Sequence, residues 1–199
     1  MKHDLEQFSA ACHAILKQDP GVEGRKRVCA LVQDVLKDDE FIKTYLTDDV
    51  PERQVLYEDP ELGFCILGHV YHGAKDSNPH DHGPSWAIYG QARGETVMTD
   101  YALVKRASEG QAGKARRVKD YTLTPGMAYL YNEGDLHSPR RDGPTVWSVS
   151  RVGIWRRSAA TRTSASRNGP GTQEAIIRQA AARGHLPRAF RHRPAHRQS

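Results

Sequence analysis

The chain has 199 residues, of which 38% are hydrophobic, and this is enough for one ordinary globular core. No apolar run approaches the roughly 20 residues that cross a bilayer and no secretory signal begins the chain, so we expect a cytoplasmic protein without a membrane segment. The net charge of +5 is uneven, because residues 1–150 hold 18 Lys and Arg against 23 Asp and Glu, whereas residues 151–199 hold 11 Arg and a single acid, Glu174.

Residues 1–50 are predicted to form a helical N-terminal cap. Apolar residues recur there at spacings of three and four, which places each set along one stripe of a helix. Asp19-Pro20-Gly21 separates two such stripes, and Pro51 is expected to end the helical section. The two stripes are Leu5, Phe8, Cys12, Ile15 and Leu16, and then Val28, Leu31, Val32, Val35 and Leu36.

From residue 51 to about residue 155 the pattern changes to that of strands. Short segments rich in β-branched and aromatic residues alternate with turns that contain Gly, Pro, Asp or Asn. Such a succession is typical of an antiparallel sandwich or barrel. We therefore expect a mainly β protein with the helical cap packed beside it.

Residues 156–199 are predicted to be a basic tail of low complexity. Few large apolar residues occur there, so the segment cannot bury enough surface to offset the entropy of ordering it, and we expect disorder over most of it. A short helix is considered at residues 172–183. The arginines also admit binding to nucleic acid, but no aromatic platform accompanies them, so we do not expect that function.

Three histidines form the strongest chemical signal in the sequence. His80 and His82 stand two residues apart, and in a strand side chains at that spacing point to the same face. His137 follows a glycine-containing turn in a distant segment and is the third candidate ligand. A set of neutral imidazoles suits iron, zinc, copper or nickel, and it argues against magnesium and calcium.

These motifs resemble those of cupins, and among cupins the chain is similar to the cysteine dioxygenase type of thiol dioxygenase. The first cupin motif runs from a Gly through His-x-His to a Glu and a second Gly, and Gly73, His80 and His82 fit it. The Glu is absent here, as it is in thiol dioxygenases, and the segment YLYNEGDLHSPRR resembles their second motif with His137 as the third ligand. The resemblance covers about residues 50–150 and implies a double-stranded β-helix, the jelly-roll barrel of cupins.

The resemblance also implies a cofactor and a substrate-binding residue. Thiol dioxygenases hold Fe(II), which is the expected metal here, with Ni, Cu or Zn as alternatives. In that family an Arg 26 or 27 residues before the first His receives the substrate carboxylate, and Arg53 stands 27 residues before His80. The cysteine that some cysteine dioxygenases crosslink to a tyrosine falls at Ala87, and no tyrosine stands near Ile154, where the family's outer-sphere hydroxyl is expected.

Neighbouring residues receive plainer interpretations. Trp86, four residues after His82, is expected to face inward as a wall of the substrate pocket. His69 is interpreted as a surface or barrel-rim histidine, and Arg140 with Arg141 as a solvated pair at a turn. The other strand aromatics, Tyr89, Tyr129, Tyr131 and Trp147, are interpreted as core packing.

The leading functional hypothesis is a non-haem Fe(II)-dependent dioxygenase of the cysteine dioxygenase type. Such an oxidoreductase would use O2 to oxidise a small anionic substrate, and the reaction considered first is the oxidation of a thiol acid to a sulfinate. One alternative keeps the metal and cleaves a β-dicarbonyl or acts as a lyase. Another is a metal-binding or small-ligand-binding cupin without turnover. The expected partners are a small-molecule substrate and O2, and the expected assembly is a monomer or a homodimer.

Overall fold

The computed structural model describes residues 4–48, 51–106, 108, 111–152, 163–167 and 174–179. Three helices come first and strands follow, as the sequence predicts. The helices are α1 (Leu5–Gln18), α2 (Val22–Val35) and α3 (Asp39–Tyr45). The strands are β1 (Gln54–Glu58), β2 (Phe64–Tyr71), β3 (Lys75–Asp76), β4 (Trp86–Arg93), β5 (Thr96–Lys105), β6 (Gly113–Leu123), β7 (Ala128–Tyr131), β8 (Leu136–Arg141), β9 (Thr145–Val152), β10 (Thr163–Arg167) and β11 (Glu174–Gln179).

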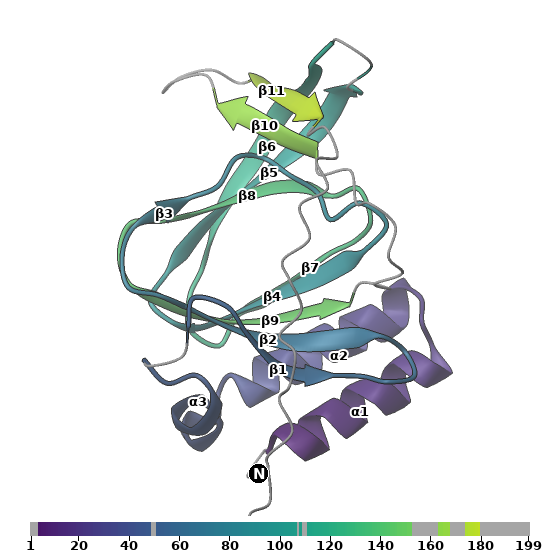
Figure 1. The fold of residues 1–199 in the computed structure, drawn as a ribbon, viewed down its shortest axis with the longest axis vertical. Coiled ribbons are helices and arrows are strands. Elements are labelled where there is room, and N and C mark those ends of the chain that lie inside the picture. The colour runs from purple at the N-terminus through teal and green to yellow at the C-terminus, as the bar shows by residue number, and fades with distance from the viewer. Residues whose placement is uncertain are drawn as a thin grey trace, which may run out of the picture.

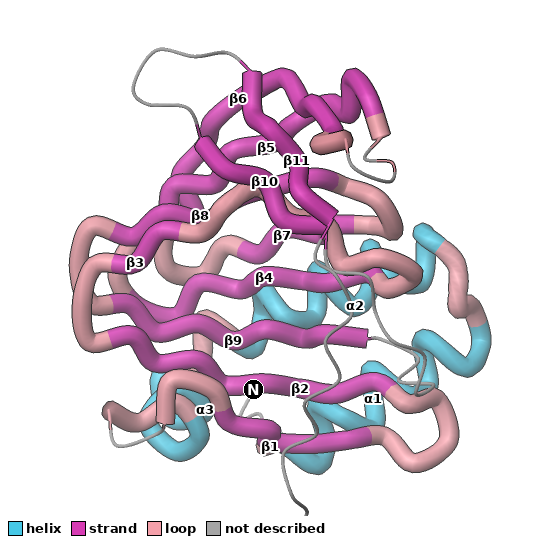
Figure 2. Tube along the Cα trace, turned by 45° about the horizontal axis from the view of Figure 1, so that its top comes forward, coloured by secondary structure: helices cyan, strands magenta, loops and turns pink. Residues whose placement is uncertain are grey.

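The strands form two antiparallel sheets that face each other (Figure 1). Sheet A has the order β1-β2-β9-β4-β7, whose strands lie side by side in Figure 2, and sheet B has the order β10-β11-β6-β5-β8-β3. Without the outermost β1, β10 and β11, the strands from β2 to β9 form one set in the order β2-β9-β4-β7 and another in the order β6-β5-β8-β3. This interleaving is that of a jelly roll, the double-stranded β-helix found in cupins. The predicted fold class is confirmed.

The helices cover the outer face of sheet A (Figure 1). The predicted apolar stripes are their buried faces, and they share one hydrophobic cluster with outward-facing residues of β2 and β4. Asp4 and Asp38 cap α1 and α3, because each aspartate side chain accepts a hydrogen bond from a first-turn backbone N–H. The helical cap thus shares a hydrophobic core with the outer face of sheet A, and this core is separate from the cluster inside the barrel. No helix within the described residues is long and apolar enough to cross a membrane.

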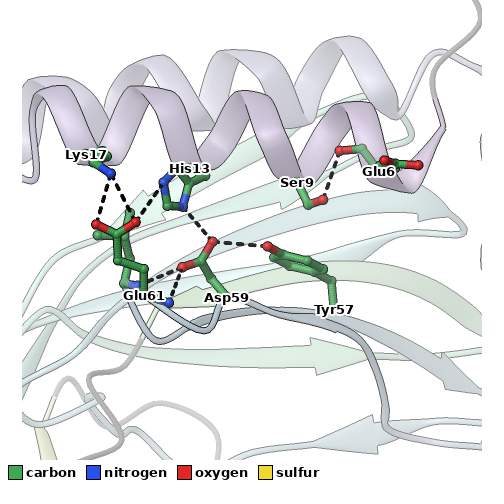
Figure 3. A network of polar contacts seen from close by, with 8 residues as sticks. Glu6, Ser9, His13, Lys17, Tyr57, Asp59 and Glu61 are labelled. Carbon is green, nitrogen blue, oxygen red and sulfur yellow. Dashed lines mark hydrogen bonds and ion pairs between the residues drawn. The ribbon is translucent and has the colours of Figure 1, made fainter.

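A polar network fastens α1 to the turn between β1 and β2 (Figure 3). Asp59 is 2% exposed, and its carboxylate accepts hydrogen bonds from His13 Nδ1 at 2.8 Å, from the Tyr57 hydroxyl at 3.1 Å and from the Leu62 N–H at 2.7 Å. Burial alone would raise the pKa of this carboxyl group, but these hydrogen bonds outweigh it and hold the pKa below its usual range. The exposed Glu61 contacts both His13 and Lys17 at the edge of the network.

The tail departs from expectation where the structure describes it. Strand β11 pairs with β6, with Glu174 opposite Arg116, and β10 pairs with β11 to extend sheet B. The helix considered at residues 172–183 is therefore wrong over β11, because the open edge of β6 offers backbone hydrogen-bonding groups that a strand can satisfy. Within the predicted tail the structure describes only β10 and β11, and the rest lies outside the described residues.

Candidate metal centre

A tight turn delivers His137 to the interior of the barrel. The Asp135 side chain accepts a hydrogen bond from the Asn132 N–H at 2.7 Å, and Gly134 has a φ of +82°, a left-handed conformation that favours glycine. Strand β8 begins two residues after Gly134, at Leu136, and it pairs with β5 so that His137 lies opposite Asp100. The His137 side chain is 0% exposed.

His80 and His82 come from the loop between β3 and β4. His80 forms an isolated backbone bridge with His137, with hydrogen bonds of 2.9 and 3.0 Å in the two directions. His82 lies outside the regular strands, just before a turn in which the Asp81 side chain accepts a hydrogen bond from the Gly83 N–H at 3.0 Å. The expectation that both histidines lie in one strand is therefore wrong. Proline on either side of the motif lacks the N–H that a continuous ladder would need.

The three imidazoles nevertheless converge. Their ring centroids are 4.7 Å apart for His80 and His137, 5.0 Å for His82 and His137, and 5.5 Å for His80 and His82. One nitrogen from each ring lies within 4.8 Å of the others, a grouping that can hold one metal ion. The predicted convergence of residues from distant parts of the sequence is what the structure shows.

Hydrogen bonds fix the tautomers of two of these histidines. His80 Nδ1 donates to the carbonyl oxygen of Asn78 at 2.9 Å, and His137 Nδ1 donates to the carbonyl oxygen of Asp135 at 3.0 Å. A carbonyl oxygen only accepts, so each ring carries its proton on Nδ1 and its lone pair on Nε2, as a metal ligand requires. Burial, followed by the charge of His80, lowers the pKa of His137 to about 3, which keeps that ring neutral.

The chemistry of the site fits a transition metal. His137 Nε2 is buried and has no hydrogen-bond partner among the described residues, an arrangement that is unfavourable unless something binds there. The grouped donors are three imidazoles, and imidazole nitrogen suits iron, copper, nickel or zinc better than magnesium or calcium. An ion held by His80, His82 and His137 would give the buried His137 Nε2 a partner.

Two tyrosines border the histidines, and the sequence alone did not single them out. The Tyr89 hydroxyl lies 3.1 Å from His82 Nε2, and the ring of Tyr131 stacks on His137 at a centroid distance of 3.9 Å. Burial raises the pKa of Tyr131 far above its usual value, so its hydroxyl stays protonated while it pairs with the Tyr121 hydroxyl. The signal that could have found Tyr89 is its place two residues after Ala87 on β4, since alternate residues of a strand share a face.

Trp86 faces the opposite way from the expected pocket wall. It is 5% exposed within the cluster between sheet A and the helices, and the guanidinium of Arg25 on α2 lies 5.4 Å from its ring centroid. The prediction assumed that strand alternation runs from His82 to Trp86, but the turn at Gly83 resets it before β4 begins. Arg25 also forms an ion pair with Glu133 at 2.7 Å, which ties α2 to the turn before His137.

A cavity of about 170 Å³ opens beside the histidines. His80, His82 and Tyr89 line it together with Arg53, His69, Tyr71 and Arg141, and its remaining lining residues are Leu67, Ser77 and Pro139. Arg53 thus shares a cavity with two of the three histidines. The interpretation of Arg141 as a solvated residue is wrong, because it is 3% exposed, whereas the neighbouring Arg140 is exposed and pairs with Asp142. His69 also lines the cavity, because alternation along β2 turns it inward beside Leu67 and Tyr71.

The comparisons with known proteins give structural similarities only. No protein-family model matches the sequence, and no curated protein matches it either. Cupins are among the solved structures with a similar arrangement, including a cupin superfamily protein from Desulfitobacterium hafniense DCB-2, with 10% identity and a TM-score of 0.37 over 54% of this chain and 82% of that one.

A dioxygenase and a further solved structure are also similar. Hydroquinone 1,2-dioxygenase from Sphingomonas sp. TTNP3 has 14% identity and a TM-score of 0.40 over 53% of this chain and 68% of its own. KdgF from Halomonas sp. has 15% identity and a TM-score of 0.37 over 53% and 82%. The fold of the present chain is therefore assigned from its own strand order, which is that of a cupin-type double-stranded β-helix.

Proposed function

We propose that this protein is a non-haem Fe(II)-dependent dioxygenase of the thiol dioxygenase kind, which oxidises a small thiol acid to a sulfinate. The observation that carries the proposal is the buried, unpartnered Nε2 of His137 beside two further imidazoles at a cavity that contains arginines. In the reaction both atoms of O2 are added to the substrate sulfur, so the thiol RSH becomes RSO2H, sulfur loses four electrons and O2 gains them. No other reductant is needed.

His80, His82 and His137 would hold the iron. Three neutral ligands leave the full 2+ charge of the ion and several open positions, so a bound ferrous ion supplies sites for an anionic substrate and for O2. The neutral state of His137 favours this role, because an imidazolium cannot ligate a cation. The carbonyl oxygens of Asn78 and Asp135 hold the two tautomers that direct lone pairs to the shared space.

Other residues of the cavity would orient the substrate. Arg53 offers a planar fork that matches a carboxylate, and it lines the same cavity as His80 and His82. The Tyr89 hydroxyl, 3.1 Å from His82 Nε2, is placed to donate a hydrogen bond to a group bound beside that histidine. Tyr131 packs over His137 and excludes water from that side of the site.

Oxygen uptake with product analysis tests the proposal. The full chain is loaded with Fe(II) without air and then mixed with O2 and a panel of thiol acids and β-dicarbonyls. We expect one O2 consumed per thiol and a sulfinate as product, with no uptake in His137→Ala. Iron binding without uptake across the panel would contradict the dioxygenase, and a cleaved carbon skeleton would indicate the β-dicarbonyl-cleaving alternative.

A further inference from the structure

Arg141 is held rigidly inside the cavity. It ends β8, where it is 3% exposed, and its guanidinium lies 4.1 Å from the ring centroid of Tyr71. Cation–π stacking of this kind fixes the plane of the guanidinium, so its donors keep a set direction. Arg140 provides a contrast, because it faces outward and pairs with Asp142 at 2.9 Å. Alternation along β8 thus selects one arginine of the pair for the interior.

The cavity around Arg141 is positively charged. Arg53 lines the same space, and no carboxylate is found among the described residues that line it. Burial, and then the charges of Arg53 and Arg141, lower the pKa of His69 to about 4, so that ring is neutral at pH 7. Glu52 is the acid whose charge acts on Arg141, but its side chain is 61% exposed and forms an ion pair with Lys75.

We propose that Arg141 and Arg53 each bind one carboxylate, so that the substrate of this site is a small dicarboxylic acid. The inference rests on the proposed function, in which a third donor of the same molecule binds the metal. A monocarboxylate would neutralise one guanidinium and leave a second cation in a site that would also hold an ion of charge 2+. A second carboxylate would balance that charge, because it can form a bidentate hydrogen-bonded pair with the second guanidinium.

The size of the cavity limits the substrate further. Its volume of about 170 Å³ is well below the roughly 300–1,000 Å³ of pockets for drug-sized ligands. A dicarboxylic acid of a few carbons is small enough for this cavity, and each arginine would bind one of its two carboxylates. Within the proposed reaction, the substrate class is therefore a short dicarboxylic acid that carries a thiol.

Calorimetry with matched acids tests this inference. The first pair is butyrate and succinate on the metal-free protein, and the second is 3-mercaptopropionate and mercaptosuccinate on the iron-loaded protein without air. In both pairs the second acid differs chiefly by an added carboxylate. We expect the diacid to bind roughly 10- to 100-fold more tightly, as one added charge-assisted ion pair suggests. Arg141→Gln should remove this preference, and Arg140→Gln should leave it unchanged.

Further variants separate the possible failures. Arg53→Gln alters an exposed residue and should also remove the preference, which keeps the test valid if Arg141→Gln does not fold. Equal affinities for the two acids of each pair, or the same loss in Arg140→Gln, would overturn the inference even if iron and oxygen uptake confirm the dioxygenase. A preference for succinate that depends on Arg141 in a protein that binds no iron would support the anion site and contradict the proposed function.

Discussion

The two faces of β4 perform different tasks although their residues alternate along one strand. Trp86, Ile88 and Ala92 face the helices within an apolar cluster, whereas Ala87 and Tyr89 belong to the smaller cluster inside the barrel. The outer face is thus a packing surface, and the inner face borders the histidines through the Tyr89 hydroxyl. We therefore expect substitutions on the outer face of β4 to change stability and substitutions on its inner face to change metal binding.

Removal of a proposed metal ligand should have the largest effect on the inner side. His137→Ala is expected to lower metal affinity by more than about 100-fold, because loss of a ligand should exceed the 10- to 100-fold losses seen for residues that only support ligands. Equilibrium dialysis against Fe(II) or Zn(II) with elemental analysis measures this. His72→Ala, at an exposed histidine nearby in sequence, is the control. An equal loss in both variants would contradict the proposed ligand set.

On the outer side the largest effect should be on stability. Ile88 is 0% exposed between sheet A and the helices, so Ile88→Ala should lower the free energy of unfolding by about 2–5 kcal/mol. Urea unfolding measures the change, and metal affinity should stay within about threefold of the wild type. If metal binding instead fell as far as in His137→Ala, the two faces would not be independent.

The network that joins α1 to the turn after β1 should contribute a pH-dependent stability. Asp59→Asn replaces a buried carboxylate that accepts several hydrogen bonds. We expect it to lower the free energy of unfolding by about 1–3 kcal/mol at pH 7. The pKa of Asp59 is lowered in the folded state, so its stabilisation is present above the usual Asp pKa and is lost as the pH falls through the folded value.

Unfolding curves from pH 7 down to pH 2 test whether the stabilisation from Asp59 is lost in acid. The difference between wild type and Asp59→Asn should shrink as the pH falls. Glu61→Gln is the matched control, because this residue also contacts His13 but is 54% exposed, and its effect should stay within about 0.5 kcal/mol. A gap between wild type and Asp59→Asn that widens in acid would refute the assigned direction.

The smallest effect is expected for a single hydroxyl on the inner face. Tyr89→Phe should weaken substrate binding in the metal-loaded protein by several-fold to about tenfold, in line with the loss of one hydrogen bond. Tyr129→Phe is the control, because its hydroxyl accepts a hydrogen bond from Lys119 and Tyr129 is not among the residues that line the cavity. Calorimetry on both variants makes the comparison, and equal affinities would show that the Tyr89 hydroxyl has no role in binding.

The sequence predicts the fold class and the three histidines because both depend on local pattern. Helical spacing, strand alternation and the turn before His137 each act over a few residues. The orientations of Trp86, His69 and Arg141 depend on where each strand begins and on which strand lies beside it, and these are properties of the whole barrel. The pairing of β11 with β6 is similarly distant in sequence. Residues near Ile154, where the family's tyrosine was expected, lie outside the described part.

The central claim is that three imidazoles hold one metal ion inside the barrel. The most direct measurement is the metal content of the full chain after Fe(II) loading, combined with X-ray absorption spectroscopy of the bound ion. The account predicts about one ion per chain with histidine nitrogen as its protein ligands, and loss of that ion in His137→Ala. An ion bound mainly by oxygen or sulfur, or one retained fully in that variant, would contradict it.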